Sequence, residues 1–166
     1  MNLDGGVHRI PLEGVPGELW LCGKHAIAPD PRGLFDRIER LDRAPRVVCL
    51  VEPHELAGRY DDYVRWLGSS DSADWFPIHD LTSPPIDEVW PLYSTVWQHL
   101  GQGEVVVAHC AAGIGRAGTL AVAMCLMNGM ELTEAMSHVR QHRPGAGPEA
   151  GSQLAMLEEL AGRLLG

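Results

Sequence analysis

Residues 104–119 read EVVVAHCAAGIGRAGT, and this stretch decides the fold. Residues 104–108 form the strongest β-branched run of the chain, which predicts a buried strand. A short loop containing Gly113 and Gly115 follows, and Arg116 then opens an apolar helix. A strand, a tight glycine loop and a helix in this order are typical of the anion-binding turns of α/β proteins.

The rest of the chain predicts strands that alternate with helices. The patterns indicate strands at 18–23, 46–51 and 75–79, and helices beginning near 31, 60, 87, 116, 134 and 149. Pro77 marks the third of these strands as an edge strand, and Asp30 and Asp87 are expected as helix N-caps. Leu34, Ile38 and Leu41 are expected on one face of the first helix.

This alternation implies an α/β fold: a single domain with a central, mostly parallel sheet flanked by helices. The glycine loop is placed between the last central strand and the helix that follows it. We expect one domain over residues 1–166, with its core at about 18–164. The Gly- and Pro-rich residues 1–17 are expected to form an N-terminal loop segment.

Charge and hydropathy exclude several classes of protein. The 166 residues carry 13 Lys and Arg against 22 Asp and Glu, a net charge of −9, which opposes binding to nucleic-acid phosphates. The longest uncharged apolar stretch, 118–130, is shorter than the ~20 residues of a membrane span. The N-terminus lacks the pattern of a signal peptide. We therefore expect a cytoplasmic protein with no nucleic-acid or membrane partner.

The sequence gives little support for a metal site. The four cysteines form no CxxC pair, and Cys22, Cys49 and Cys125 lie in apolar runs that are typical of buried positions. His138 and His142 share a helix face, but no third ligand stands at an obvious spacing. We expect neither a metal nor a cofactor.

Cys110 lies in different surroundings, at the start of the glycine loop. The loop is short enough that the backbone N–H groups of residues 111–116 should converge on one anion. The positive end of the following helix adds to this field, which favours a thiolate nucleophile at Cys110. Arg116 returns to the same site with a planar guanidinium suited to two phosphoryl oxygens. The residues expected to bind phosphate are Ala111, Ala112, Gly113, Ile114, Gly115 and Arg116.

The segment HCAAGIGRAGT at 109–119 resembles the HCxxGxxR loop of the cysteine-dependent protein tyrosine phosphatase superfamily. The short chain is similar to its compact, atypical dual-specificity branch. WFPIHD at 75–80, with the two prolines at 84–85, resembles the general-acid loop of those enzymes. HRPG at 142–145, followed by Glu149 and Gln153, resembles their RPG…E…Q segment. The likeness covers about residues 18–162.

The resemblance implies three catalytic residues. Cys110 would form a phosphocysteine intermediate and Arg116 would clamp the phosphoryl group. Asp80 would protonate the leaving oxygen and then activate water. The alternative for Asp80 is an ordinary turn or cap. The other aspartates weighed for this role are Asp71, Asp74 and Asp87.

Supporting roles are implied for residues around the loop. His109 would orient the loop through a bond from its ring to the backbone near Cys110. Gln153 would help to place water, or else lie on a solvated helix face. Arg143 would contact the loop from the next turn, or else form a salt bridge at the end of its helix.

Ala117 departs from the family pattern. Most relatives carry Ser or Thr there, whose hydroxyl bonds the cysteine sulfur and helps it leave in the second step; the regenerating-liver phosphatases also carry Ala. We expect the second step to be slow. Some relatives also link the catalytic cysteine to a second cysteine, and Cys49 is a candidate partner for Cys110, although the family position corresponds to Val51.

The loop itself suggests a substrate class. It carries no lysine, which disfavours highly phosphorylated lipids and favours a phosphorylated protein or peptide. The short chain implies a shallow pocket that accepts phosphotyrosine and also phosphoserine or phosphothreonine. Its rim is expected from Trp20, His25, Trp75 and His79, unless these side chains pack in the core.

The sequence therefore predicts a protein phosphatase that works through phosphocysteine. Three rivals remain open: a non-catalytic phosphate-binding adaptor, an enzyme acting on small phosphates, and a rhodanese-like sulfur transferase.

Overall fold

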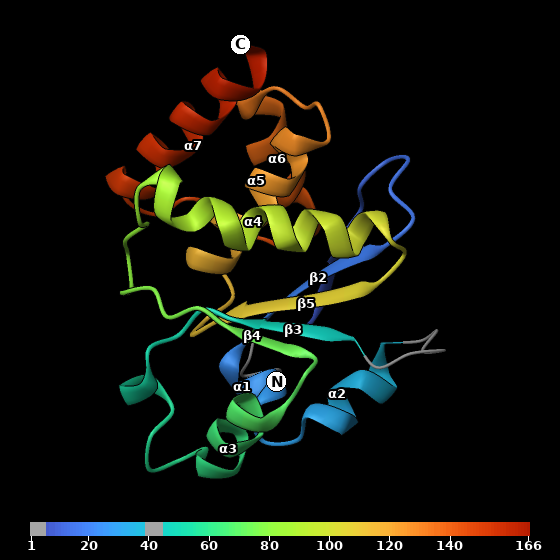
Figure 1. Cartoon of the computed structure of the whole chain (residues 1–166), viewed down its shortest axis with the longest axis vertical. Helices are drawn as coiled ribbons and strands as arrows, with labels where there is room; N and C mark the ends of the chain where they lie inside the picture. Colours follow the sequence, from blue (N-terminus) through green and yellow to red (C-terminus); the bar gives the residue numbers. More distant parts are fainter. Residues whose placement is uncertain (1–5, 39–44) are drawn as a thin grey trace.

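The computed structural model describes residues 6–38 and 45–166. They form a five-stranded sheet in the order β1-β2-β5-β3-β4 (Figure 1). β1 pairs antiparallel with β2, and the other pairs are parallel, which confirms the predicted α/β architecture. The strands are β1 His8–Ile10, β2 Glu18–Gly23, β3 Arg46–Cys49, β4 Ala73–Trp75 and β5 Val105–Cys110.

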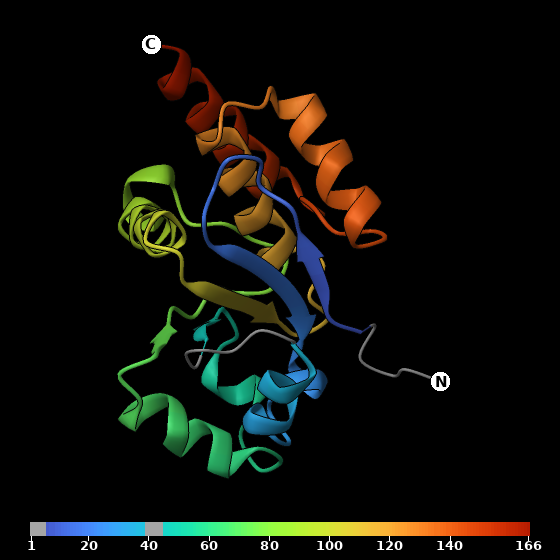
Figure 2. The same cartoon turned by 90° about the vertical axis from the view of Figure 1, so that its right-hand side faces the viewer.

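Helices cover both faces of the sheet (Figures 1 and 2). One face carries α1 Lys24–Ile27, α2 Pro31–Arg37 and α3 Asp61–Ser69. The other carries α4 Ile86–Gly101, α5 Arg116–Met127, α6 Leu132–His142 and α7 Gly151–Leu165. A 3-10 turn, η1 Pro53–Glu55, follows β3. No helix in the described part of the chain combines the length and apolarity that a membrane span requires.

The centre of the fold is the unit formed by β5 and α5. β5 lies between β2 and β3, and its residues Val106, Val107 and Ala108 are fully buried. α5 is buried on all sides from Arg116 to Leu126, because it packs between the sheet and the other helices of its face. The loop between them therefore lies at the carboxyl end of the central strand, where parallel sheets place their ligands.

The edges of the sheet correct two expectations. Residues 1–17 are not all loop, because β1 extends the sheet and brings Ile10 opposite Leu19. The predicted strand at 75–79 is displaced to Ala73–Trp75, since Pro77 has no N–H for a regular ladder. The N–H groups of Phe76 and Ile78 still bond to the end of β3 and just beyond it, at the carbonyls of residues 49 and 50.

Helix starts differ in detail from the expectations. Asp30 caps α2 as predicted, because its carboxylate accepts a bond from the Gly33 N–H at 3.1 Å. Asp87 is not an N-cap: α4 begins at Ile86, after Pro85, and Asp87 lies in its first turn. The short α1 and η1 carry no periodic signal and were not predicted. The expected position of Leu41 lies outside the described residues.

Candidate active site

The carbonyl groups of residues 111–114, in the loop after β5, all accept hydrogen bonds from other segments of the protein. The Ala111 carbonyl accepts from the Lys24 N–H at 3.0 Å, and the Ile114 carbonyl accepts from the Gly147 N–H at 3.0 Å. The guanidinium of Arg143 donates to the carbonyls of Ala112 and Gly113 at 2.9 and 2.7 Å. Hydrogen bonds from other segments therefore hold the backbone of the loop in place.

The N–H groups of the same loop are left for a ligand. Within the described residues, no backbone N–H from 111 to 116 donates to a protein acceptor. Polar backbone groups near a protein interior need partners, so this set is arranged to receive an anion. α5 begins at Arg116 and adds its positive end to the same place.

Of the two glycines in the loop, Gly113 makes the curl possible. Gly113 has φ +73°, and a Cβ there would lie 2.4 Å from the backbone of Cys22. A Cβ on Gly115 would lie 2.2 Å from Oε1 of Glu149. A side chain on Gly113 would therefore force the loop away from its present course, whereas a Cβ on Gly115 would require the flexible Glu149 side chain to move.

Cys110 lies at the end of β5 with 3% of its surface exposed, beneath this ring of N–H groups. All four cysteines are free thiols. Cys49 pairs in register with His109, one residue before Cys110. Burial raises the pKa of Cys49 to about 12, so Cys49 remains a neutral thiol. The disulfide that was considered between Cys49 and Cys110 is not formed.

Arg116 is held by a carboxylate that the sequence analysis did not single out. Both oxygens of Glu55 accept bonds from its guanidinium at 2.8 Å, and the Ile78 carbonyl accepts a third at 2.7 Å. Burial raises the pKa of Glu55, but the bonds from Arg116 and from the Glu52 N–H outweigh it and hold that pKa below its ordinary value. The charge of Arg116 is thus fixed in place.

One donor of Arg116 has no protein partner. Its Nε is buried and unbonded among the described residues, while the whole side chain is only 1% exposed. A buried guanidinium N–H without a partner costs stability unless a ligand satisfies it. Together with the loop N–H groups it fits a tetrahedral oxyanion bound above Cys110.

Asp80 lies close to the guanidinium of Arg116. Its Oδ1 is 3.5 Å from Nη2 of Arg116, and its side chain is 61% exposed. The next residue, Leu81, has φ +62°, and its N–H bonds to Asp80 at 2.9 Å, so the turn fixes the carboxyl. The structure brings Asp80 to Arg116. Asp87 is instead paired with Arg163, and Asp74 with Arg46, away from the loop.

His109 is a buried, neutral residue. Burial lowers its pKa to about 4, and the nearby charge of Arg116 acts in the same direction. Nδ1 lies 3.3 Å from the Cys110 carbonyl, which can only accept, so Nδ1 carries the proton. Nε2 then accepts from the Tyr63 hydroxyl at 2.7 Å. His109 therefore holds the loop and does not carry protons.

Gln153 and Arg143 are buried as well. Gln153 is fully buried: Oε1 accepts from the Glu149 N–H at 2.6 Å, and Nε2 donates to the Thr82 carbonyl at 3.3 Å. The alternative of a solvated helix face is wrong, because this side chain ties α7 to the loop after Asp80. Arg143 is 2% exposed and contacts the loop after β5 through the carbonyls of Ala112 and Gly113, as the sequence analysis expected.

The four residues expected at the rim of the substrate pocket differ in their exposure. Trp20 and Trp75 pack against the core, and the Trp75 indole donates to the Val51 carbonyl at 2.8 Å. His25 bonds the Tyr60 hydroxyl at 2.5 Å. Only His79, whose Nδ1 lies 2.8 Å from Glu52, has a largely exposed side chain, at 74%. The two tryptophans therefore follow the core-packing alternative.

The acidic group beside Arg116 is not free to bind a metal. Glu52, His54 and Glu55 bring potential ligand atoms within 4.8 Å of one another. Both oxygens of Glu55 already accept from Arg116, and Glu52 contacts His79.

The sequence signal for Glu55 was weak, since it is one of several acids in a short turn after β3.

Comparison with known proteins identifies the relatives of this arrangement. Residues 66–160 match the family described as dual specificity phosphatase, catalytic domain. The chain is 35% identical over 75 residues to protein tyrosine phosphatase type IVA 3 of Mus musculus, a match covering 44% of this chain and 43% of that protein. It is 43% identical over 61 residues to dual specificity protein phosphatase 1 of Arabidopsis thaliana, covering 35% and 31%.

Among solved structures, the fold is similar to that of Tk-PTP in the active form. The TM-score is 0.69 at 27% identity, over 94% of this chain and 97% of that one. The two curated matches each span less than half of the relative's length.

Proposed function

Because this chain belongs to the dual specificity phosphatase family, we propose that it is a cysteine-dependent protein phosphatase. Its substrates are phosphorylated proteins or peptides, dephosphorylated at tyrosine and also at serine or threonine. It acts in the cytoplasm. The observation that carries the proposal is a group of hydrogen-bond donors around Cys110 that have no protein acceptor. They are the loop N–H groups and Nε of Arg116.

In the first step, the Cys110 thiolate attacks the phosphorus of the phosphomonoester. The sulfur–phosphorus bond forms as the bond to the ester oxygen breaks, and the loop N–H groups and Arg116 stabilise the charge on the phosphoryl oxygens. Asp80, protonated, gives its proton to the departing oxygen. The contact of Asp80 with Arg116 at 3.5 Å supports this role, because both groups would then face the same phosphoryl group.

In the second step, water attacks the phosphocysteine. The Asp80 carboxylate takes the water proton, the sulfur–phosphorus bond breaks, and Cys110 leaves as thiolate with release of inorganic phosphate. Ala117 is fully buried and offers no hydroxyl to the departing sulfur. We therefore assign the slower of the two steps to hydrolysis of the intermediate.

The test is hydrolysis of p-nitrophenyl phosphate followed in the first turnover and at steady state. The proposal predicts a burst of nitrophenol close to one per protein, and neither burst nor turnover in Cys110→Ser. Peptides carrying phosphotyrosine, phosphoserine or phosphothreonine then measure preference by kcat/KM. Activity that survives Cys110→Ser would refute the mechanism.

Ala117 also favours a second candidate, a phosphate-binding adaptor without turnover. Such a protein would bind phosphopeptide with micromolar affinity and release no phosphate. The two candidates separate in one experiment, because phosphopeptide binding to wild-type protein without a burst favours the adaptor.

A further inference from the structure

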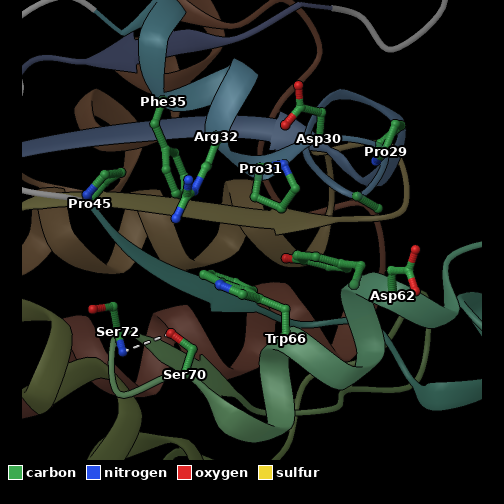
Figure 3. Close-up of a pocket in the computed structure, with 12 residues that line it drawn as sticks. Pro29, Asp30, Pro31, Arg32, Phe35, Pro45, Asp62, Trp66, Ser70 and Ser72 are labelled. Carbon is green, nitrogen blue, oxygen red and sulfur yellow. Dashed lines mark hydrogen bonds between the residues drawn. The ribbon is translucent and has the colours of Figure 1, made fainter.

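A cavity away from the candidate active site lies on the face of the sheet opposite α5. It occupies about 490 Å³ between α2 and α3. Figure 3 shows side chains from both helices facing one another across it, with Phe35 on one side and Trp66 on the other. Its walls are largely aromatic and prolyl: Pro29, Pro31, Phe35, Pro45, Tyr63 and Trp66. This volume lies in the range of small-molecule sites.

The aromatic walls suit a flat ligand. The rings of Tyr63 and Trp66 are stacked, with centroids 5.7 Å apart and planes at 15°. Phe35 is tilted by 53° against Trp66 at 6.5 Å. A planar ring entering beside them would meet a stacking face and an edge, the two arrangements that aromatic pairs prefer.

A single cation enters this cavity from α2. Figure 3 shows the Arg32 side chain directed into the space above Trp66. Arg32 has no hydrogen bond or ion pair with any described residue. The two acids that line the cavity are already engaged: Asp30 caps α2, and Asp62 pairs with Arg65. No described carboxylate forms an ion pair with this guanidinium.

A smaller cavity between α4 and α7 differs from this one in the pairing of its arginine. It occupies about 340 Å³ beside Trp90 and also contains an arginine, Arg163. That guanidinium is already paired with Asp87 at 2.7 Å and with Glu159 at 2.8 Å. An anionic ligand would have to displace a carboxylate there, but not at Arg32.

We propose that the cavity between α2 and α3 is a binding site for a small planar aromatic anion. The ring packs against Phe35 and Trp66, and the acidic group pairs with Arg32. Recognition needs both parts, because the walls supply apolar contact and the arginine supplies the charge.

The site communicates with the nucleophile loop through its wall. Tyr63 lines the cavity, and its hydroxyl donates to Nε2 of His109 at 2.7 Å. His109 in turn bonds the Cys110 carbonyl at 3.3 Å. A ligand that packs against Tyr63 therefore changes the surroundings of the His109 ring.

The test compares two fluorescent probes that differ only in charge. 8-Anilino-1-naphthalenesulfonate carries the sulfonate, and N-phenyl-1-naphthylamine lacks it. Both are titrated against wild-type protein, Arg32→Ala and Arg140→Ala. Arg140 is a matched control, since it is an exposed arginine on α6, across the sheet. Trp90→Ala controls for the smaller cavity.

We expect one sulfonate probe per chain, bound about fivefold more weakly by Arg32→Ala, as for a partly exposed ion pair. The neutral probe should bind Arg32→Ala and wild type alike, and Arg140→Ala and Trp90→Ala should leave both affinities unchanged. Equal effects of Arg32→Ala and Arg140→Ala, loss of binding in Trp90→Ala, or no saturable binding would overturn the site.

The link to the loop is measured without any substrate. In a histidine-selective NMR spectrum, the ring Cε1–H signal of His109 should shift as the sulfonate probe saturates. The signal of His99, which pairs with Glu104 at the far end of β5, should stay in place. Saturation with no shift at His109 would refute the communication through Tyr63.

Discussion

Replacing Glu55 by Gln tests how Arg116 is held. Glu55 accepts two bonds at 2.8 Å from the guanidinium, and its side chain is 13% exposed. Glutamine keeps one acceptor oxygen but turns an NH2 group toward the second guanidinium nitrogen. The carbonyl of Ile78 still accepts at 2.7 Å, so the side chain stays anchored while its plane is freed to rotate.

The expected loss follows from these contacts. A hydrogen bond to a charged group is worth about 1.5–3 kcal/mol, and one of two such bonds is lost outright. If that positioning is used in the transition state, kcat/KM for p-nitrophenyl phosphate falls about 10- to 100-fold. Vanadate is expected to bind the same donors as phosphate, so its inhibition should weaken in parallel.

The control is Glu18→Gln. Glu18 pairs with Arg9 at 2.9 Å and is also largely buried, but it lies at the start of β2, level with Val105 and far from the loop. This variant should keep its kcat/KM within twofold. A loss of less than threefold in Glu55→Gln would refute the positioning argument.

The same carboxylate predicts a pH effect on stability. Since the pKa of Glu55 lies below its ordinary value of 4.5 in the folded protein, its stabilising contribution is present above that value. It is lost as the pH falls through the lowered pKa. The difference in unfolding free energy between wild type and Glu55→Gln should therefore shrink as the pH is lowered from 6 to below 4.5; a constant difference would contradict it.

Three further predictions follow from the loop. Ala117→Ser should raise steady-state turnover severalfold and shrink the nitrophenol burst, measured by stopped flow; equal turnover with no burst in either protein would count against a slow second step. Gly113→Ala should abolish activity and lower the melting temperature, because its Cβ would lie 2.4 Å from the Cys22 backbone at φ +73°; an active, equally stable variant would show that the loop can shift. Since burial lowers the pKa of His109 to about 4, the unfolded chain binds a proton that the folded protein excludes, so wild type should lose up to about 3 kcal/mol between pH 6.5 and 4. Urea titrations of wild type and His109→Gln should show that steeper pH dependence in wild type alone.

The central unit of the fold was predictable because its signals are local. The run at 104–108 and the glycine loop specify a buried strand, a curl and a helix without reference to any other part of the chain. β1 was missed because three residues carry no pattern of their own, and only the pairing of Ile10 with Leu19 makes them a strand. The N-cap of α4 was misplaced by two residues because Asp87 looks like a cap, whereas the helix begins directly after Pro85.

The candidate site likewise contains residues that local sequence patterns predict and residues that only long-range contacts reveal. The loop residues were predicted from spacing, since their proposed function depends on neighbours in the sequence. Glu55, Tyr63 and the burial of Gln153 depend on contacts across long separations. Arg116 and Glu55 are 61 residues apart, and His109 and Tyr63 are 46 apart. Single-sequence patterns carry no information on such pairs.

Direct detection of phosphocysteine tests the central claim. Wild-type protein would be mixed with p-nitrophenyl phosphate, quenched in acid within the first turnover, digested and analysed by mass spectrometry. The account predicts a phosphate on the peptide that contains Cys110, at a large fraction of the chains because Ala117 slows its hydrolysis, and none in Cys110→Ser. Rapid nitrophenol release with no phosphate on Cys110, or with phosphate on another residue, would contradict it.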